Sequence, residues 1–232
     1  MRVPASEISG ARQALVAPLR EFEPGIFETP RDDDARRGLG FLIVEGLMAR
    51  DLLLAGNIAT ELLGEGDLLQ PEVGLREDGL LPHKVFWHTL TTTTMAVLND
   101  DFAKRLVRWP QVTAALLERA GRRAHRMAIH QALLELSPAE TRLLVLFWHI
   151  AERWGHVTPR GIVLRLSLTH QLLGQLVGCR RASVTTALKQ LTTNELLVHR
   201  DDGSWLLTGS PPHELHRANG MRPRQLAHER AG

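Results

Sequence analysis

The sequence predicts an α+β protein built from an N-terminal β domain, a long helix and a C-terminal winged helix-turn-helix. Three observations support this fold class. Short apolar runs separated by glycine fill residues 38–71, a nearly glycine-free stretch follows Asn99, and a pattern of helix, glycine, helix and hairpin begins near Ser167. With 232 residues, 44% of them hydrophobic, the chain is long enough for two modest domains with cores of their own.

The first half of the chain carries the signals of an all-β domain. Four segments combine leucine, β-branched and aromatic residues in short runs bounded by turn residues. They span residues 41–44, 47–54, 59–63 and 84–98. The last is long enough for two strands, and residues 64–67 (GEGD) predict a turn. We therefore expect a small barrel or sandwich over residues 38–109, with residues 1–37 as an N-terminal flank and residues 71–82 as a loop.

The stretch after Asn99 changes to a helical period. Trp109-Pro110 separates a short predicted helix from a long one over residues 110–136. Mostly apolar and small residues recur along the long helix at steps of three and four, a spacing typical of a coiled-coil seam. They are Val112, Leu116, Ala120, Ala124, Met127, Gln131 and Leu134. Such a stripe either packs on the β domain of its own chain or pairs with a second copy, and its narrowness favours a dimerisation helix.

A second domain is predicted over residues 137–210. The run SPAE at residues 137–140 has the spacing of an N-cap serine, a first-turn proline and a capping-box glutamate, so we expect a helix from Pro138 to Trp154. Alternating apolar residues over 162–166 then predict a strand. The polar residues 211–232 are expected to form a flexible tail.

The most informative segment lies within this second domain. Thr169 has the position of an N-cap for a short helix that ends before Gly178, and this glycine allows a tight turn. A second helix is expected over residues 181–192, followed by a hairpin whose Asp202-Gly203 pair is a strong turn signal. Helix, glycine turn, helix and hairpin in this order predict a winged helix-turn-helix.

Charge is distributed unevenly along the chain. Residues 21–101 hold 6 Lys and Arg against 16 Asp and Glu, a net charge of −10, whereas residues 102–232 hold 19 against 9, a net charge of +10. A basic half attracts phosphate through the release of counterions, although an acidic protein or a lipid surface would also be attracted. The helix-turn-helix pattern in the basic half makes double-stranded DNA the predicted partner.

The second helix of this motif is the predicted reading element, because an α-helix fits the major groove of B-DNA. Arg181 is predicted to read a base, since a guanidinium can bond guanine bidentately, and Thr186 is a second predicted base reader. Residues predicted to contact phosphate, or to bind DNA from the wing, surround them. They are Thr169, Gln171, Arg180, Ser183, Lys189 and, in the wing, Arg200. The alternative is a helix pair that only packs a core and whose arginines are solvated.

Residues 168–197 resemble the helix-turn-helix of the Crp/Fnr family, whose catabolite activators share a Gly-Gln-apolar-Val-Gly-Cys run, here residues 174–179. The order of β domain, long helix and winged domain also follows the family, so the resemblance covers roughly residues 38–208. It implies a β-roll of the cyclic-nucleotide-binding type as a sensory domain, and a homodimer bound to a near-palindromic operator. The implied function is sequence-specific regulation of transcription, with RNA polymerase left open as a further partner.

The resemblance also concerns individual residues. The family's base-reading arginine matches Arg181, whereas Ala182 replaces its acidic reader and Thr186 its second arginine, so the usual catabolite-activator half-site is not implied. Members that bind cyclic AMP hold it with a Gly-Glu pair and an Arg-Ser/Thr-Ala triplet, and Glu72 and Arg76 do not reproduce this cassette. Cyclic AMP is therefore not expected, and another nucleotide effector, or none, stays open.

The cysteine and the histidines of the sequence do not predict a metal site or a redox site. Cys179 is the single cysteine, which excludes an internal disulfide and a cysteine-ligated iron-sulfur cluster, suits a reducing cytoplasm, and is expected to be a small buried thiol. The closest histidine pairs, at 83 and 88 and at 125 and 130, lack metal-ligand spacing.

No catalytic motif and no run of about 20 apolar residues is present, so neither an enzyme nor a membrane protein is predicted. The rival interpretation is a cupin-like small-molecule binder or enzyme that carries an accessory DNA-binding module.

Overall fold

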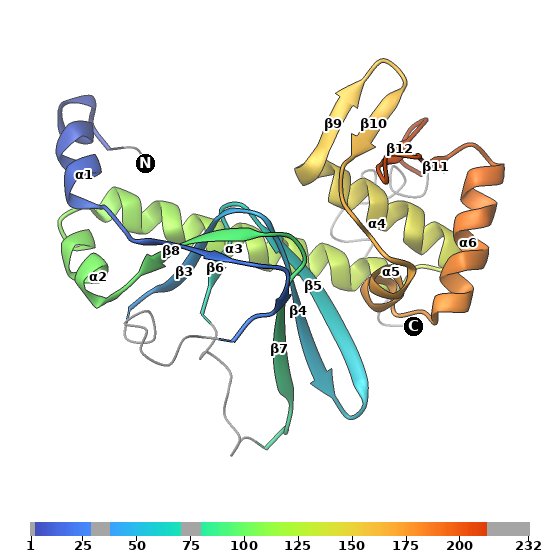
Figure 1. Ribbon diagram of the computed structural model, residues 1–232, viewed down its shortest axis with the longest axis horizontal. Helices are drawn as coiled ribbons and strands as arrows, with labels where there is room; N and C mark the ends of the chain where they lie inside the picture. Colours follow the sequence, from blue (N-terminus) through green and yellow to red (C-terminus); the bar gives the residue numbers. More distant parts are fainter. Residues whose placement is uncertain (1–2, 29–37, 71–79, 213–232) are drawn as a thin grey trace, which may run out of the picture. The chain divides into compact units, whose positions relative to one another are not determined.

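The computed structural model describes residues 3–28, 38–70 and 80–212, which Figure 1 draws in colour. The chain divides into two compact units, with the division between Ile129 and His130. Each unit combines antiparallel strands with helices, which confirms the predicted α+β fold class. Among the helices in these ranges, none combines the length and the apolar content that crossing a membrane requires.

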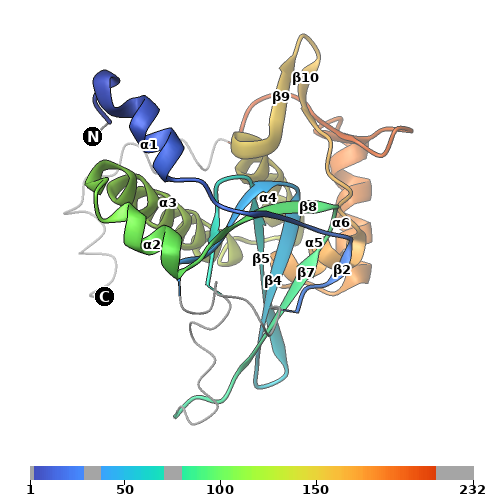
Figure 2. The same cartoon turned by 60° about the vertical axis from the view of Figure 1, so that its left-hand side comes forward.

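The first unit contains two four-stranded antiparallel sheets. Their strands are β1 (Leu19–Phe22), β2 (Gly25–Ile26), β3 (Gly40–Glu45), β4 (Leu47–Leu54), β5 (Asn57–Gly64), β6 (Leu68–Leu69), β7 (Lys84–Thr89) and β8 (Thr93–Leu98). One sheet has the order β1-β8-β3-β6 and the other β2-β7-β4-β5; Figure 2 shows β4, β5 and β7 side by side. The strands expected within residues 41–98 are confirmed, and residues 84–98, expected to form one or two strands, form two.

One core cluster of the first unit consists of side chains from both sheets and of Phe27. It contains Phe27, Phe41, Ile43, Met48, Leu63, Leu69, Trp87, Met95 and Val97. Phe27 stacks edge-on against Phe22 and against Phe41, with ring centroids 5.0 and 5.8 Å apart. Residues 19–27, which were expected to belong to the N-terminal flank, therefore complete the sheets and close the core. The β domain begins before residue 38.

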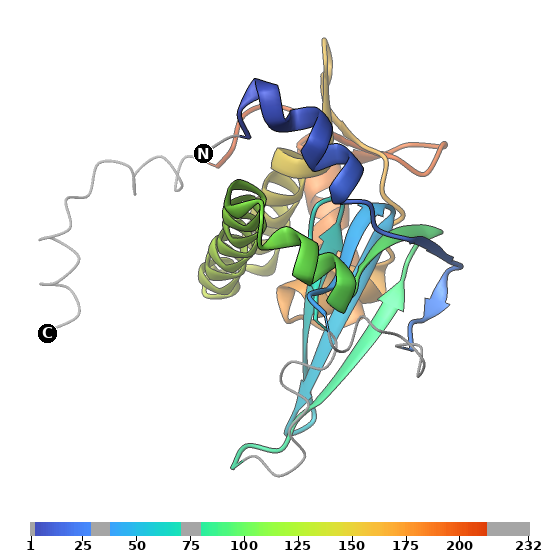
Figure 3. The ribbon, with the colours of Figure 1, turned by 90° about the vertical axis from the view of Figure 1, so that its left-hand side faces the viewer.

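Among the described residues, two helices precede the strands of this unit and two follow them. They are η1 (Ala5–Glu7), α1 (Ile8–Ala14), α2 (Asp100–Leu106) and α3 (Pro110–Leu134), the last of which is seen nearly along its axis in Figure 3. Asn99 caps α2, because its side-chain oxygen accepts a hydrogen bond from Phe102 N at 2.9 Å. The predicted break before Pro110 and the long helix after it are confirmed.

The apolar stripe of α3 divides between two faces. Val112 and Leu116 pack against the buried side chains of their own unit, which corrects the expectation that they belong to a dimer seam. The cluster they cover consists of Ala96, Leu98, Phe102 and Leu106. From Ala120 onward the residues of the stripe are exposed. The exposed part of the helix begins with Leu117, which is 68% exposed, and not with its half-buried neighbour Leu116. The reason is helical geometry: one residue rotates the side-chain direction by about 100°.

The second unit is a winged helix-turn-helix domain. Its elements are α4 (Ala139–Trp154), β9 (Gly155–Thr158), β10 (Gly161–Leu164), α5 (His170–Val177), α6 (Arg181–Thr193), β11 (Leu197–His199) and β12 (Trp205–Leu207). The strands form one antiparallel sheet in the order β11-β12-β10-β9. Trp205 of β12 packs on Phe147 of α4, with ring centroids 5.1 Å apart, so the sheet and the helices share a core. The strand expected near residue 164 is β10, whereas β9 was not predicted.

The start of α4 differs from the expectation. The helix begins at Ala139, Pro138 occupies the N-cap position, and no side chain caps it, so Ser137 and Glu140 do not form a capping box. Pro138 has extended backbone angles, and its carbonyl accepts a hydrogen bond from Arg142 N at 3.2 Å. Because proline has no N–H, it fits this position without leaving a donor unpaired.

Candidate nucleic-acid interface

The candidate interface is built on α5, the turn that follows it and α6. Thr169 caps α5, because its hydroxyl accepts a hydrogen bond from Leu172 N at 3.1 Å. Gly178 ends the helix with left-handed backbone angles, φ 63° and ψ 34°, which glycine adopts without strain. Position 174 also requires glycine, since a Cβ there would lie 2.7 Å from Cys179 O. The turn between the two helices is therefore tight, as predicted.

Helix α6 has a buried stripe and an exposed face. The buried side chains, which lie toward the core of the second unit, are Val184, Ala187, Leu188 and Leu191. The helical period places Ala182, Thr186 and Lys189 opposite this stripe, with Arg181 and Ser183 at the two edges of the exposed face. The predicted DNA-binding residues of α6 thus lie on its solvent-exposed face.

All eight residues predicted to bind DNA are exposed to solvent. They are Thr169, Gln171, Arg180, Arg181, Ser183, Thr186, Lys189 and Arg200. Seven of them lie on α5, α6 or the residues that flank these helices, and Arg200 lies in the hairpin between β11 and β12. Exposure is a condition for contact with DNA, and the contact itself stays a prediction.

His170 and Thr185, which were not among the predicted DNA-binding residues, join the two helices at this face. The Thr185 hydroxyl donates to Arg181 O at 3.1 Å, and its oxygen accepts a hydrogen bond from His170 Nδ1 at 3.0 Å. The Thr186 hydroxyl likewise donates to the carbonyl four residues earlier, Ala182 O, at 3.2 Å. A threonine within a helix can donate its hydroxyl hydrogen bond to the carbonyl four residues earlier. The positions of Thr185 and Thr186 in the predicted helix were therefore the available signal for these two bonds.

The wing is closed by local hydrogen bonds. Asp202 accepts hydrogen bonds from the hydroxyl and the backbone N–H of Ser204, at 2.5 and 2.9 Å, and these bonds lower the pKa of Asp202. Arg200 N donates to Ser204 O at 2.8 Å, and Gly203 has a φ of 76°, so the predicted Asp-Gly turn is confirmed. The Arg200 guanidinium lies 4.0 Å from the Asp202 carboxylate, which offsets part of its positive charge.

The electrostatic character of the helix pair is positive. Between Ser167 and Asn194 the sequence contains no Asp or Glu, and its basic side chains are Arg180, Arg181 and Lys189. The N-terminus of α6 adds the partial positive charge of unpaired backbone N–H groups, which favours an anion such as phosphate. A polyanion is therefore the ligand class that suits this surface.

Similarity to known proteins is found at the level of structure. No protein-family model matches the sequence, and no curated protein matches it. FixK2 from Bradyrhizobium japonicum aligns with a TM-score of 0.66 at 18% identity, over 90% of this chain and 100% of that one. A CooA mutant from Carboxydothermus hydrogenoformans aligns with a TM-score of 0.65 at 19% identity, over 90% and 93%. TTHA1359 from Thermus thermophilus, a transcriptional regulator of the CRP/FNR family, aligns with a TM-score of 0.56 at 18% identity, over 83% and 94%.

This chain has the Crp/Fnr fold. The resemblance inferred from the helix-turn-helix is thereby confirmed for the architecture of β-roll, long helix and winged domain.

In the β-roll of this Crp/Fnr fold, arginines of α3 pair with carboxylates of the strands. Arg123 forms two hydrogen bonds with the Glu61 carboxylate, both 2.8 Å, and donates to Leu68 O at 3.0 Å. Arg126 pairs at 2.5 Å with Asp67, whose side chain is buried. Burial, the largest single cause, lowers the pKa of Arg123, but the hydrogen bonds and charge of Glu61 and the charge of Asp67 together outweigh it, so the pKa lies above its ordinary value. These pairs attach α3 to the β-roll.

Few of the β-roll residues considered for ligand binding in the sequence lie among the described residues. Glu72 and Arg76, which do not reproduce the cyclic AMP cassette of the family, lie outside the described residues. Within the described ranges, no group of three His, Cys, Asp or Glu side chains is placed to hold a metal ion. His83 Nδ1 lies 3.0 Å from a nearby carbonyl, and His88 lies 3.4 Å from Asp51.

Cys179 is half-buried rather than buried as expected. It lies in the turn between α5 and α6, directly after the exposed Gly178, so the turn leaves its side chain partly open to solvent. Its sulfur is 3.7 Å from Nη1 of Arg142.

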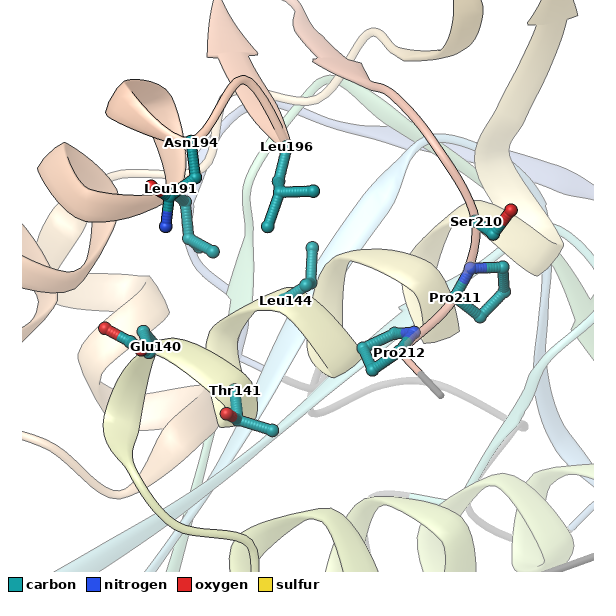
Figure 4. A pocket seen from close by; sticks show the side chains of 9 residues that line it. All are labelled: Glu140, Thr141, Leu144, Leu191, Asn194, Leu196, Ser210, Pro211 and Pro212. Atoms are coloured by element: carbon teal, nitrogen blue, oxygen red, sulfur yellow. The ribbon is translucent and has the colours of Figure 1, made fainter. Parts of the chain in front are cut away.

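A pocket of about 480 Å³ lies in the winged domain (Figure 4). Its lining consists of Glu140, Thr141, Leu144, Leu191, Asn194, Leu196, Ser210, Pro211 and Pro212. Three leucines give it apolar walls, and the start of α4 and the end of α6 contribute polar groups. Because Leu191 belongs to the buried stripe of α6, the pocket lies on the side of the helix opposite the candidate interface.

Proposed function

We propose that this protein is a sequence-specific DNA-binding transcription regulator. The observation that carries the proposal is the exposed face of the helix-turn-helix, which has no acidic residue and presents Arg180, Arg181 and Lys189. Structures that share the fold include TTHA1359, a transcriptional regulator, and CLP of Xanthomonas campestris, a c-di-GMP-responsive global regulator. A winged helix-turn-helix with this charge favours duplex DNA over other polyanions.

The exposed residues divide into two roles in this proposal. Arg181 at the start of α6 reads a base edge in the major groove, and Thr186 one turn later is the second reader. The remaining residues position the domain on the phosphate backbone. They are Thr169, Gln171, Arg180, Ser183 and Lys189 on the helix pair and Arg200 in the wing.

The regulator acts as a homodimer in this proposal. The surface for dimerisation, here called the exposed seam, consists of Leu117, Ala120, Ala124, Met127, Gln131 and Leu134 of α3, all exposed and spaced by three and four residues. Leu117 and Met127 are 68% and 43% exposed, and the alanines allow close approach of a second helix. Burying these side chains is favourable, and a dimer provides two recognition helices, as two half-sites in major grooves about 34 Å apart require.

The β-roll is the sensory domain in this proposal. Its effector is a nucleotide other than cyclic AMP, or the domain acts without an effector. RNA polymerase is a further partner, the compartment is the cytoplasm, and no enzymatic activity is included.

Selection of bound sequences from random duplex DNA with the purified protein tests the proposal. We expect an enriched near-palindromic motif, and Arg181→Ala is expected to lose preference at one position of each half-site. Arg160→Ala, which removes an exposed arginine from the turn between β9 and β10, serves as the control that keeps the motif. Repeating the selection with cyclic mono- and dinucleotides tests the effector. Binding without any enriched motif would contradict a sequence-specific regulator.

A further inference from the structure

We propose that His130 and Arg142 determine which half-site spacing the dimer accepts, because they hold the helix-turn-helix on the last turn of α3. The inference rests on the proposed function, since spacing is a property of a DNA-bound dimer. All contacts that carry it lie within the second unit, which begins at His130.

The first contact joins α3 directly to α5. His130 Nε2 donates a hydrogen bond to Leu176 O at 2.6 Å. Leu176 lies in the last turn of α5, where backbone carbonyls have no partner within the helix. His130, which lies on α3 and 46 residues before Leu176 in sequence, therefore supplies one of the missing donors.

The second contact joins three elements through one guanidinium. Arg142 Nη1 donates to Val177 O at 2.7 Å and lies 3.7 Å from Cys179 Sγ, while Nε donates to Leu136 O at 3.0 Å. Leu136 follows the end of α3, Arg142 belongs to α4, and Val177 is the last residue of α5. The planar fork of an arginine satisfies these acceptors at fixed angles, which a lysine cannot reproduce.

The same turn of α3 also carries part of the exposed seam. Gln131 and Leu134 belong to the seam, whereas Leu133 between them is buried, with 2% of its surface exposed. Leu134 also lies beside the turn of the motif, since a Cβ added to Gly178 would be 3.8 Å from its Cδ2. The last turn of α3 thus faces a second copy on one side and supports α5 on the other.

The consequence concerns the placement of α6. This helix follows α5 after a tight turn, so the bonds from His130 and Arg142 to the end of α5 determine where α6 lies relative to Gln131 and Leu134 of the seam. One inserted base pair moves a half-site by about 3.4 Å along the DNA and about 35° around it. A dimer in which α5 is held firmly on α3 should bind an operator of altered spacing more weakly. A dimer in which this attachment is loosened should bind both spacings with similar affinity.

The test measures affinity for operators that differ only in spacing. The motif selected by the wild-type protein is rebuilt with zero, one or two base pairs added or removed between the half-sites, and a single half-site is included. Dissociation constants are measured by fluorescence anisotropy for wild type, His130→Leu, His130→Gln and Arg142→Lys. His125→Leu, at an exposed position of the same helix, is the matched control.

We expect wild type and His125→Leu to prefer one spacing by about tenfold or more over its neighbours. His130→Leu and Arg142→Lys should reduce this preference to about threefold or less, with the affinity for a single half-site changed by less than about twofold. His130→Gln keeps a donor and should retain part of the preference.

Three outcomes would overturn the inference. The first is an unchanged spacing preference in both His130→Leu and Arg142→Lys. The second is an equal loss of affinity for single and paired half-sites, and the third is unfolding of both variants, since either would show that the contacts only stabilise the domain. If the wild-type protein selects no motif at all, the proposed function itself is wrong.

Discussion

Arg181 and Lys189 lie on the same exposed helix, but their positions predict different roles. Arg181 is at the N-terminus of α6, where side chains reach base edges, and Lys189 is two turns later, where they reach phosphate. We expect Arg181→Ala to weaken binding to the selected operator by about 1–3 kcal/mol and to relax preference at one position. Lys189→Ala should weaken binding to all sequences alike.

Fluorescence anisotropy with the selected operator and with random duplex DNA separates these roles. If both variants lose equal affinity on both kinds of DNA, the assignment of Arg181 as a base reader is wrong.

Gly174 shows that a single missing Cβ controls the turn of the motif. A methyl group at this position would lie 2.7 Å from Cys179 O, a backbone atom that cannot move without distorting the turn. We expect Gly174→Ala to lower the free energy of unfolding by about 1–3 kcal/mol, measured by urea denaturation at fixed protein concentration. Gly121→Ala is the control, because open space surrounds Gly121 and alanine is the better helix former. A loss no larger than that of the control would contradict this explanation.

At the scale of elements, the attachment of α3 to the β-roll depends on charged pairs of unequal burial. The Arg123 and Glu61 side chains are 19% and 15% exposed and form two hydrogen bonds, whereas Arg122 and Glu118 pair on the solvent side of the helix. We expect Glu61→Gln to lower the free energy of unfolding by about 1.5–3 kcal/mol, because glutamine removes the negative charge and one of the two acceptors of Arg123 in a half-buried site.

The control for this prediction is Glu118→Gln, which should change the free energy of unfolding by less than about 0.5 kcal/mol, as expected for an exposed pair. Equal effects of the two substitutions, measured by thermal and urea unfolding, would show that the Glu61 pair does not hold α3.

The exposed seam of α3 is the element on which the proposed dimerisation depends. We expect the double substitution Leu117→Glu and Met127→Glu to convert a dimer into a monomer at micromolar concentration, because it places like charges where apolar side chains would be buried. Val107→Glu is the control, since this exposed valine lies outside α3. Sedimentation velocity distinguishes the species. A wild-type protein that sediments as a monomer with and without operator DNA would contradict the dimer.

At the scale of the whole molecule, the two halves of the sequence differ in net charge, −10 for residues 21–101 and +10 for residues 102–232. The acidic half forms most of the β-roll, and the basic half includes the winged domain. Arg180, Lys189 and Arg200 supply three predicted phosphate contacts in each protomer, about six in a dimer. The logarithm of the binding constant should therefore fall with the logarithm of salt concentration with a slope of about −5.

Lys189→Ala removes one contact from each protomer, so the magnitude of this slope should decrease by about 2. Binding constants measured by anisotropy between about 50 and 200 mM salt, a range typical for such titrations, provide the slope. A slope that the substitution leaves unchanged would show that Lys189 does not contact phosphate.

Much of the candidate site could be predicted because its signals are local. Thr169 and Gly178 lie within a few residues of the groups they cap or end, and the Asp202-Gly203 turn is closed by the neighbouring Ser204. The contact between His170 and Thr185 was missed, since it joins two helices and depends on how they pack. The support of α5 by His130 was missed for the same reason, because its partner is distant in sequence.

The sequence by itself determined the order of β domain, long helix and winged domain, the break at Pro110 and the helix-turn-helix, because hydrophobic period and turn chemistry are properties of neighbouring residues. Only the tertiary structure decided that Leu116 is covered while Leu117 is exposed, that residues 19–27 complete the β-roll, and that Pro138 replaces Ser137 as the cap of α4. Burial depends on which distant segments pack together, and a stripe that repeats every three to four residues does not reveal which of its members meets its own chain.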